Sequence, residues 1–520
     1  MSIAAVIMMA SVLLSRVAGM FREMTLANLG GTSGEMDAYV AAFLIPELLN
    51  HFLAGGFLSV TFIPIFQKYI AANDEPGAWK TFSNMVTVGT AAFAAVLPAA
   101  VIFTPNLLSL TGFANQSPET FALTARLTRI ILPAQIFFYW GAFLMAVQYA
   151  KQKFFLPAMA PLLYNMGIIA GGIFLSPVMG IEGFAWGVLA GAFVGNVAVQ
   201  LPGALKVGMR YGFRFSPADP EFIHYIKLTL PLVAGLGMSF SNEIFFRYFA
   251  SFLESGAVAG ANYALRTMMI LVGVFGQASG VAFYPYLTKL AAEKAYGRMS
   301  ELLNDTVNKV ALCLLPLTGV MMALAPQIVM ILYEHGKFTR ESTLSTAPIL
   351  MMYLTGAFAM SVSILAARPF YAMQKTLLPM VVSTAVSILS IPLYYLFGKQ
   401  MGPKGLGLAS GVAGTAQFVI LYTMWGKKYG GFGAVRGEAA KLGKIVAVSA
   451  IGAGVCYVIN GMIGGFGIDG AGAMGGFGRG RTIMACAAAS AAALITVFGL
   501  YELLGLQRFK ESIRGLIGKR

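Results

Sequence analysis

The sequence predicts an all-α polytopic membrane protein with about fourteen transmembrane helices, and three observations support this fold class. Of its 520 residues, 58% are hydrophobic and only 11% are charged, whereas a soluble chain of this length needs more charge to cover its surface. Apolar windows of ~20 residues, the length of a helix that crosses a bilayer, recur along the whole chain. These runs are continuous and do not alternate with a period of two, so an outer-membrane barrel is not expected.

The apolar windows define fourteen predicted spans. Their approximate limits are residues 3–21, 37–65, 82–104, 127–149, 156–176, 182–205, 227–253, 259–287, 308–333, 346–367, 377–397, 405–426, 442–463 and 482–504.

The basic residues are distributed unevenly over the connections between these spans. With the N-terminus placed in the cytoplasm, the cytoplasmic connections and tail carry 24 lysines and arginines, and the opposite side carries 9. This bias follows the positive-inside rule and predicts that both termini are cytoplasmic. The net charge of +15 is therefore interpreted as topogenic charge, and no nucleic-acid partner is expected.

An internal repeat divides the chain. The segment Tyr149-Ala-Lys-Gln-Lys-Phe-Phe-Leu-Pro157 resembles Tyr371-Ala-Met-Gln-Lys-Thr-Leu-Leu-Pro379 at an offset of 222, and Phe62-x-Pro64-x-x-x-Lys68 recurs as Phe283-x-Pro285-x-x-x-Lys289 at an offset of 221. Because the repeat contains six helices, both copies face the same way. The expected organisation is an N-terminal six-helix lobe (1–222), a C-terminal six-helix lobe (223–430), and two additional helices with a basic cytoplasmic tail (431–520), with a central cavity between the lobes.

A few charged residues lie where a bilayer makes them costly. Arg16 and Arg266 fall inside predicted spans, and an ionisable residue there costs at least ~2.5–3.5 kcal/mol on insertion scales. Each arginine either faces a water-filled interior or extends its side chain to the membrane surface. Asp37 opens the second span, where it is either a functional acid or a helix-start residue stabilised by the helix dipole. Asn262 lies one helical turn before Arg266.

Two further charged pairs flank these positions. Arg22 and Glu23 follow Arg16 at the end of the first span, where they either join the same cavity or belong to the loop. Glu243 and Arg247 are spaced i,i+4 in the seventh span. Pairing within one helix reduces the desolvation cost, so we interpret them as a structural ion pair.

Three arginines contributed by two halves of a duplicated bundle predict a cationic cavity. A guanidinium group binds phosphate or carboxylate in a bidentate manner and keeps its charge when desolvated. The predicted ligand is therefore an anion. These residues alone leave open whether it is the head group of an amphiphile or a soluble anion.

Signals of enzymatic function are weak. Gly470-Ala-Gly-Ala-Met-Gly475 matches a dinucleotide-binding pattern, but no strand precedes it, and it is interpreted as a Gly-rich loop. His51, His224 and His335 lack metal-ligand spacing, and no phosphate-binding loop of an ATPase is present. We therefore expect a non-enzymatic transporter without a metal or cofactor, driven by the membrane potential or by a coupling ion.

A set of short motifs runs in order over residues 10–380. It comprises Ser15-Arg16-Val-x-Gly19-x-x-Arg22-Glu23, Asp37-Ala-Tyr-x-x-Ala-Phe43-x-x-Pro46-x-Leu-Leu49, Phe62-Ile-Pro64, Leu156-Pro-Ala-Met-Ala-Pro161-x-x-x-Asn165, Ala250-Ser-Phe-Leu253, Tyr263-Ala-x-Arg266, Leu332-Tyr-x-x-Gly336-Lys-Phe-Thr339 and Ala367-x-x-Phe370-Tyr-x-x-Gln374. Together these motifs resemble the MurJ (MviN) lipid II flippases, which belong to the multidrug/oligosaccharidyl-lipid/polysaccharide exporter superfamily.

The resemblance implies a function and a set of site residues. It implies that the chain flips undecaprenyl-pyrophosphate-linked peptidoglycan precursor across the bacterial inner membrane by alternating access. It further implies that Arg16, Arg22 and Arg266 meet the pyrophosphate and that Asp37 is also required, with Glu23 standing where the family usually has an aspartate. The last two helices are implied to form a groove that guides the lipid tail.

The chain departs from the family pattern at Leu44, Asn50, His51, Gly55 and Leu265. Two other functions remain as alternatives from the residues alone. One is a related exporter of another polyprenyl-linked glycan or an ion-coupled antiporter, which should carry acidic coupling sites deep in its spans. The other is a membrane-embedded glycan polymerase, which would need a catalytic carboxylate in a large external loop, whereas the external loops here are short.

Overall fold

The computed structural model describes residues 3–53, 57–111, 113, 116–237, 248–430, 432–463 and 479–506. Every regular element within these ranges is a helix. Eleven helical stretches among them are long and apolar enough to cross a bilayer, and each overlaps one of the fourteen predicted spans. The prediction of an all-α polytopic membrane protein is confirmed. The predicted spans 37–65 and 227–253 each include residues outside the described ranges, and the exact count of fourteen stays a prediction.

Contacts divide the chain into two compact units. The first comprises residues 1–259 together with the short segment 335–338, and the second comprises residues 260–334 and 339–520. The lobe boundary predicted at residue 222 marks the sequence repeat, whereas the first unit extends beyond it by a further 37 residues, 223–259.

The helices of the first unit run in the following order: α1 (Ile3–Gly30), α2 (Gly34–Ala42), α3 (Leu44–Leu53), α4 (Phe57–Ala71), α5 (Glu75–Ile102), α6 (Thr104–Ser109), α7 (Pro118–Ile131), α8 (Ala134–Ala150), α9 (Phe155–Ala170), η2 (Gly171–Leu175), α10 (Ser176–Met179), α11 (Glu182–Phe193), η3 (Val194–Ala198), α12 (Gln200–Lys206) and α13 (Pro220–Gly237). Elements written η are π-helical turns.

An aromatic core holds part of this unit together. Phe62 of α4, Phe82 of α5 and Phe143 of α8 are buried and stack in edge or tilted contacts with centroid distances of 5.1–6.2 Å. Each such pair contributes about 0.5–1.5 kcal/mol beyond its buried area.

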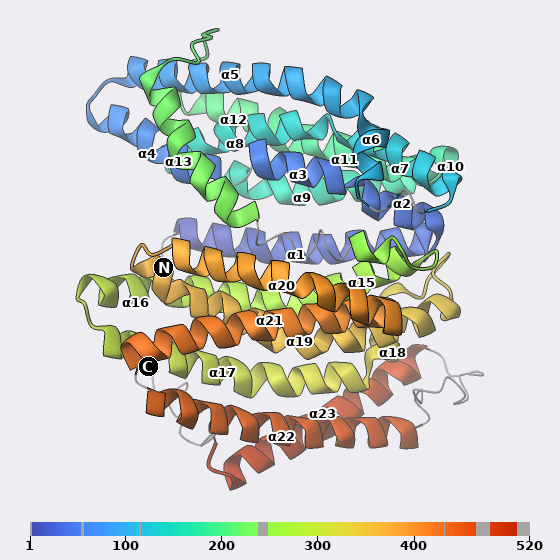
Figure 1. Ribbon diagram of the computed structural model, residues 1–520. Coiled ribbons are helices and arrows are strands. Elements are labelled where there is room, and N and C mark those ends of the chain that lie inside the picture. Colours follow the sequence, from blue (N-terminus) through green and yellow to red (C-terminus); the bar gives the residue numbers. More distant parts are fainter. Residues whose placement is uncertain are drawn as a thin grey trace. The chain divides into compact units, whose positions relative to one another are not determined.

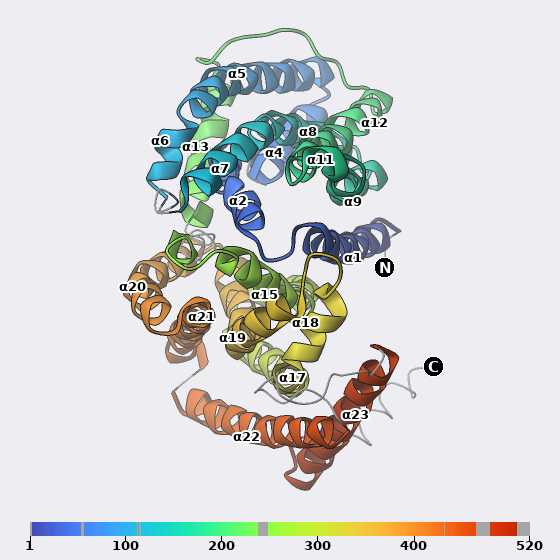
Figure 2. The ribbon, with the colours of Figure 1, turned by 90° about the vertical axis from the view of Figure 1, so that its right-hand side faces the viewer.

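Glycines set the spacing of α9 and α11, which lie side by side (Figure 2). A Cβ added at Gly187 would lie 2.6 Å from the carbonyl oxygen of Gly167. Only glycine permits this approach, as is usual where membrane helices pack closely. This packing positions α9, which carries Asn165.

The second unit contains α15 (Ala257–Leu271, whose first three residues belong to the first unit), η4 (Val272–Ala278), α16 (Ser279–Ala292), α17 (Tyr296–Ala323), α18 (Ala325–Tyr333), α19 (Arg340–Ala372), α20 (Leu377–Met401), α21 (Pro403–Trp425), η5 (Gly426–Gly430), α22 (Phe432–Met462) and α23 (Arg479–Leu503). Within it, α22 runs alongside α17 and packs against α23 (Figure 1).

Helix lengths and turns recur at the offset of the sequence repeat. Helices α5 and α17 both have 28 residues and start 221 positions apart. The helical stretches Pro118–Ala150 and Arg340–Ala372 both have 33 residues and start 222 apart. Left-handed residues recur as well, since Asn73 and Lys294, and likewise Gln152 and Gln374, have positive φ values of 55–60°. The arrangement of two lobes around one central cavity stays a prediction.

Candidate functional site

Arg22 on α1 is held by two side chains of the first unit. Its Nη2 donates to Oε1 of Glu23 at 2.6 Å, and its Nη1 donates to Oδ1 of Asn165 on α9 at 3.0 Å. The Glu23 side chain is buried, whereas that of Arg22 is 21% exposed. A guanidinium group has five N–H donors, so these two bonds fix its orientation and leave donors for an anion.

Asn165 is itself oriented by the helix that carries it. Its Nδ2 donates to the carbonyl oxygen of Pro161, one turn earlier on α9, at 2.9 Å. This bond fixes the amide so that its oxygen is the atom presented to Arg22. Packing of α9 against α1 brings the two side chains together.

Arg16 lies on α1 one and a half turns before Arg22 and is half-buried. Both arginines therefore belong to one helix of the first unit. That both side chains contact the same bound substrate stays a prediction.

Asp37, on α2, is fully buried, and both of its carboxylate oxygens accept backbone hydrogen bonds. The N–H of Gly256 donates to Oδ2 at 2.6 Å, and the N–H of Ala259 donates to Oδ1 at 2.7 Å. Helix α15 begins at Ala257, so Asp37 caps its N-terminus from another part of the chain. A carboxylate at this end satisfies amides without intrahelical partners and interacts favourably with the helix dipole. In this structure Asp37 anchors the helix that carries Arg266.

Two loop contacts lie at the same end of α1 and α2. The backbone N–H of Lys337, in the α18–α19 connection, donates to the carbonyl oxygen of Asn28 on α1 at 2.8 Å. The side-chain amide of Gln116, in the α6–α7 connection, donates to the carbonyl oxygen of Ser251. Asn28 and Ser251, and likewise Gln116 and Lys337, correspond within one residue at the repeat offset. Each repeat thus uses the same connection to hold the other repeat's chain.

Gly336 makes the first of these contacts sterically possible. Its φ is +56°, and a Cβ there would meet the carbonyl oxygen of Asn28 at 2.4 Å. Both the backbone conformation and the close approach favour glycine.

Arg266 and Asn262 lie on α15, and Arg266 belongs to the second unit. Asn262 is buried and the Arg266 side chain is half-buried. The next residue, Thr267, is buried and lies within hydrogen-bonding distance of the Tyr333 hydroxyl at 2.9 Å, which fixes this part of the helix against α18. The meeting of Arg266 with Arg16 and Arg22 in one cavity stays a prediction. Glu243 and Arg247 lie outside the described residues.

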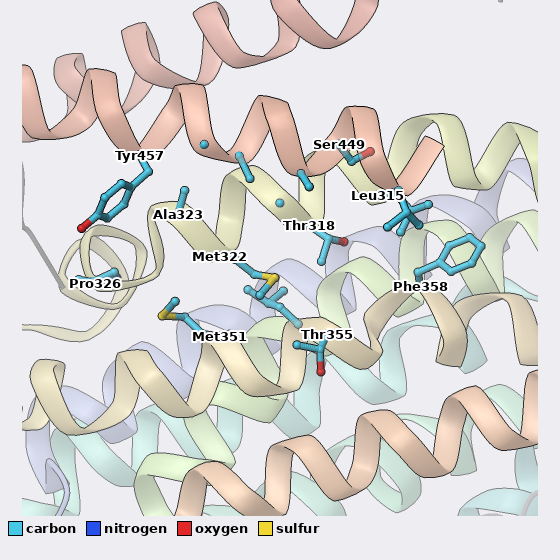
Figure 3. Close-up of a pocket in the computed structure, with 16 residues that line it drawn as sticks. Leu315, Thr318, Met322, Ala323, Pro326, Met351, Thr355, Phe358, Ser449 and Tyr457 are labelled. Carbon is cyan, nitrogen blue, oxygen red and sulfur yellow. The ribbon is translucent and has the colours of Figure 1, made fainter. Parts of the chain in front are cut away.

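A pocket of about 450 Å³ lies within the second unit, between α17, α19 and α22. Figure 3 shows Met322 of α17 and Met351 of α19 extending into the space between these helices, with Tyr457 reaching toward it from α22. The lining also includes Leu315 and Phe358 and is mostly apolar. This pocket suits a hydrocarbon chain better than a charged head group.

Sequence reasoning did not single out several of these contacts. The capping amides of Gly256 and Ala259 are backbone groups, which carry no side-chain signature. Gln116 belonged to no recognised motif, although its position relative to Lys337 at the repeat offset was a usable signal. Gly336 did appear within a motif. Among the described residues, no three His, Cys, Asp or Glu side chains gather in a way that could hold a metal ion.

Known proteins resemble this chain over most of its length. A family model described as lipid II flippase MurJ matches residues 26–469. The probable lipid II flippase MurJ of Thermotoga maritima is 28% identical over 409 residues, which cover 78% of this chain and 82% of that protein.

Two solved structures share the fold. A lipid II flippase MurJ in an inward closed conformation matches with a TM-score of 0.79 at 24% identity, covering 96% of this chain and 99% of that one. An inward-facing multidrug transporter of the MATE family matches with a TM-score of 0.68 at 14% identity, covering 82% and 98%. The name flippase denotes a transporter and not a catalyst. Because the family match spans most of the chain, including Asp37, Asn165 and Arg266, the chain belongs to the lipid II flippase MurJ family.

Proposed function

We propose that this protein flips lipid II, the polyprenyl-pyrophosphate-linked disaccharide-peptide, from the cytoplasmic to the outer face of the inner membrane for cell-wall synthesis. The family match over residues 26–469 carries this proposal. A guanidinium group held in place by Glu23 and Asn165, in an otherwise apolar helical protein, supports it.

Arg16, Arg22 and Arg266 are proposed to bind the pyrophosphate. Arginine keeps its charge in a dehydrated cavity and matches the geometry of phosphate oxygens. Glu23 and Asn165 act as positioning residues because each directs one end of the Arg22 guanidinium. Asn262, one turn from Arg266 on α15, is assigned a supporting role. So are Glu243 and Arg247, on grounds of sequence alone.

Alternating access requires the outer end of the cavity to close and open. We assign the closing contacts to the Asp37 cap on α15 and to the two loop contacts made by Lys337 and Gln116. These bonds join segments of both repeats within the first compact unit, and we propose that they separate for the head group to leave. Asp37 then acts on transport by holding α15, whether or not it also contacts lipid II.

The polyprenyl tail is proposed to occupy the apolar pocket between α17, α19 and α22. Helix α22 overlaps the thirteenth predicted span (442–463), which agrees with a tail groove in this region. Residues of α17 and α19 also line the pocket, so the proposed groove extends from the additional helices onto the second repeat.

Orientation and energy source complete the proposal. Both termini are proposed to be cytoplasmic, which the excess of basic residues on one side supports. No cofactor is assigned. An inside-negative potential assists outward movement of an anion by about 2.3 kcal/mol per charge per 100 mV, and a coupling ion can add to this.

The decisive experiment is depletion of the protein in its native host, with accessibility of lipid II to an external toxin or protease as the readout. Accessible lipid II should fall as the protein disappears. Transfer at the normal rate after depletion would reject the assignment. Arg16→Gln and Arg266→Gln should each abolish transport while the protein remains in the membrane. Full activity of both variants would mean that these side chains extend to the membrane surface and do not bind lipid II.

A further inference from the structure

A polar cluster joins α22 to the second repeat, away from the residues proposed to bind lipid II. Asn304 and Asn308 are spaced i,i+4 and share a face of α17. The Nδ2 of Asn308 donates to Oε2 of Glu438 on α22 at 2.5 Å, and the hydroxyl of Tyr422 on α21 donates to Oδ1 of Asn304 at 2.6 Å. Because Asn304 and Asn308 lie one turn apart on α17, the two pairs form one cluster.

Two acceptors in this cluster lack a positive partner. Asn308 is only 6% exposed, and its side-chain oxygen is buried without a hydrogen-bond partner. Glu438 is half-buried, and no lysine or arginine of the described chain forms an ion pair with it. The nearest basic residue on α17, Lys309, instead pairs with Asp305 at 2.7 Å.

Burial without compensation is costly for both groups. A buried acceptor without a partner costs about 1–3 kcal/mol, and a carboxylate removed from water costs more. The oxygen of Asn308 sits on the same amide carbon as the nitrogen that contacts Glu438. Rotating the amide would bring this oxygen toward the carboxylate, an arrangement that a cation bound between the two oxygens stabilises.

We propose that Asn308 and Glu438 bind a monovalent cation, Na⁺, with Asn304 and Tyr422 supplying further oxygen atoms. The donors are all oxygens, which suit hard cations. The cluster contains a single carboxylate, so one positive charge neutralises it and a divalent ion would leave excess charge. The bound ion would clamp α22 onto α17. This site goes beyond lipid transport and does not depend on it.

The test is the thermal stability of the purified full chain in detergent, without lipid II. NaCl replaces choline chloride stepwise at constant ionic strength, and the unfolding midpoint is recorded. Because a ligand that binds only the folded state stabilises it in proportion to its saturation, the midpoint should rise with Na⁺ and reach a plateau. Glu438→Gln and Asn308→Ala should abolish the response.

Matched variants distinguish loss of the Na⁺ site from the general effect of a substitution on stability. Asp305→Asn removes an equal charge from the exposed face of the same helix and should keep the Na⁺ response. Asn308→Asp preserves oxygen ligands and should also keep it. The proposal is overturned if Glu438→Gln responds like the unmodified protein, or if choline, Mg²⁺ or Ca²⁺ produces the same shift as Na⁺. Direct binding of radioactive ²²Na⁺ to the unmodified protein is the second measurement, and its absence overturns the site even if the variants misfold.

Discussion

The Asp37 carboxylate accepts a hydrogen bond from the backbone N–H of Ala259, which lies 222 residues further along the chain. This separation equals the offset of the sequence repeat. Ala259 is therefore the residue of the second repeat that corresponds to Asp37 in the first. The bond therefore joins equivalent positions of the two repeats. A second bond to Gly256 makes the same carboxylate the cap of α15.

Replacing Asp37 with Asn should destabilise the protein. The substituted amide has one acceptor and presents an N–H₂ group to a backbone N–H that needs an acceptor, so one buried amide loses its partner. The expected cost is about 1–3 kcal/mol in the free energy of unfolding, measured by thermal unfolding in detergent. Glu35→Gln is the control, because Glu35 lies on the same helix but is exposed. Equal losses in both variants would contradict the capping role.

Gly336→Ala should weaken the contact between the α18–α19 connection and α1. The new Cβ would collide with the carbonyl oxygen of Asn28, in addition to the left-handed cost of about 1–2 kcal/mol. Gly402→Ala is the matched control, because Gly402 has a φ of +62° and open space around its Cβ position. Thermal unfolding should show a larger loss for Gly336→Ala. Equal losses would mean that the contact with Asn28 contributes nothing.

Arg22 and Asn165 should be energetically coupled. A double-mutant cycle with Arg22→Gln and Asn165→Ala, measured by thermal unfolding, is expected to give an interaction term of about 0.5–3 kcal/mol in the free energy of unfolding. This is the range for other residues in direct contact. Asn196→Ala is the control, because Asn196 is buried and bonds to its own helix at Ala192. Its effect should add to that of Arg22→Gln. Additivity for Asn165 as well would remove it from the positioning role.

Filling the apolar pocket should impair binding of a long lipid tail. Gly454 lines the pocket on α22, and a Cβ there meets no atom within 4 Å, so Gly454→Leu can enter the open space without disrupting the helix. Affinity for a long-chain polyprenyl pyrophosphate should fall, and affinity for a short-chain analogue should change little. Gly461→Leu, on the same helix with open space but outside the pocket lining, should behave like the unmodified protein. Equal loss for both chain lengths would argue against a tail site.

The sequence was sufficient to predict the helices but not the polar contacts between them. Hydropathy located eleven described spans because apolar length is a local property. Helical geometry pointed Arg22 about 100° away from its neighbour Glu23, yet the long arginine side chain reaches back to that carboxylate at 2.6 Å. Side-chain reach therefore decides the pairing that backbone direction alone does not suggest.

Asp37 illustrates a second kind of limit. Its position at a helix start suggested a local dipole interaction on α2, but Ser33 accepts the hydrogen bond from Met36 that caps this helix. The Asp37 side chain instead caps α15, more than two hundred residues away. Which helix a carboxylate caps depends on tertiary packing, which a single sequence does not encode in any local pattern.

The paired loop contacts have a consequence for the ancestry of the fold. In a twofold dimer of two identical chains of half this length, the bond from Lys337 to Asn28 and the bond from Gln116 to Ser251 would be two symmetry-related copies of one contact. Fusion of the two copies frees each side to change independently. One side now uses a backbone N–H and the other a side-chain amide, so the two sides of this joint can be tuned separately, which a homodimer cannot achieve.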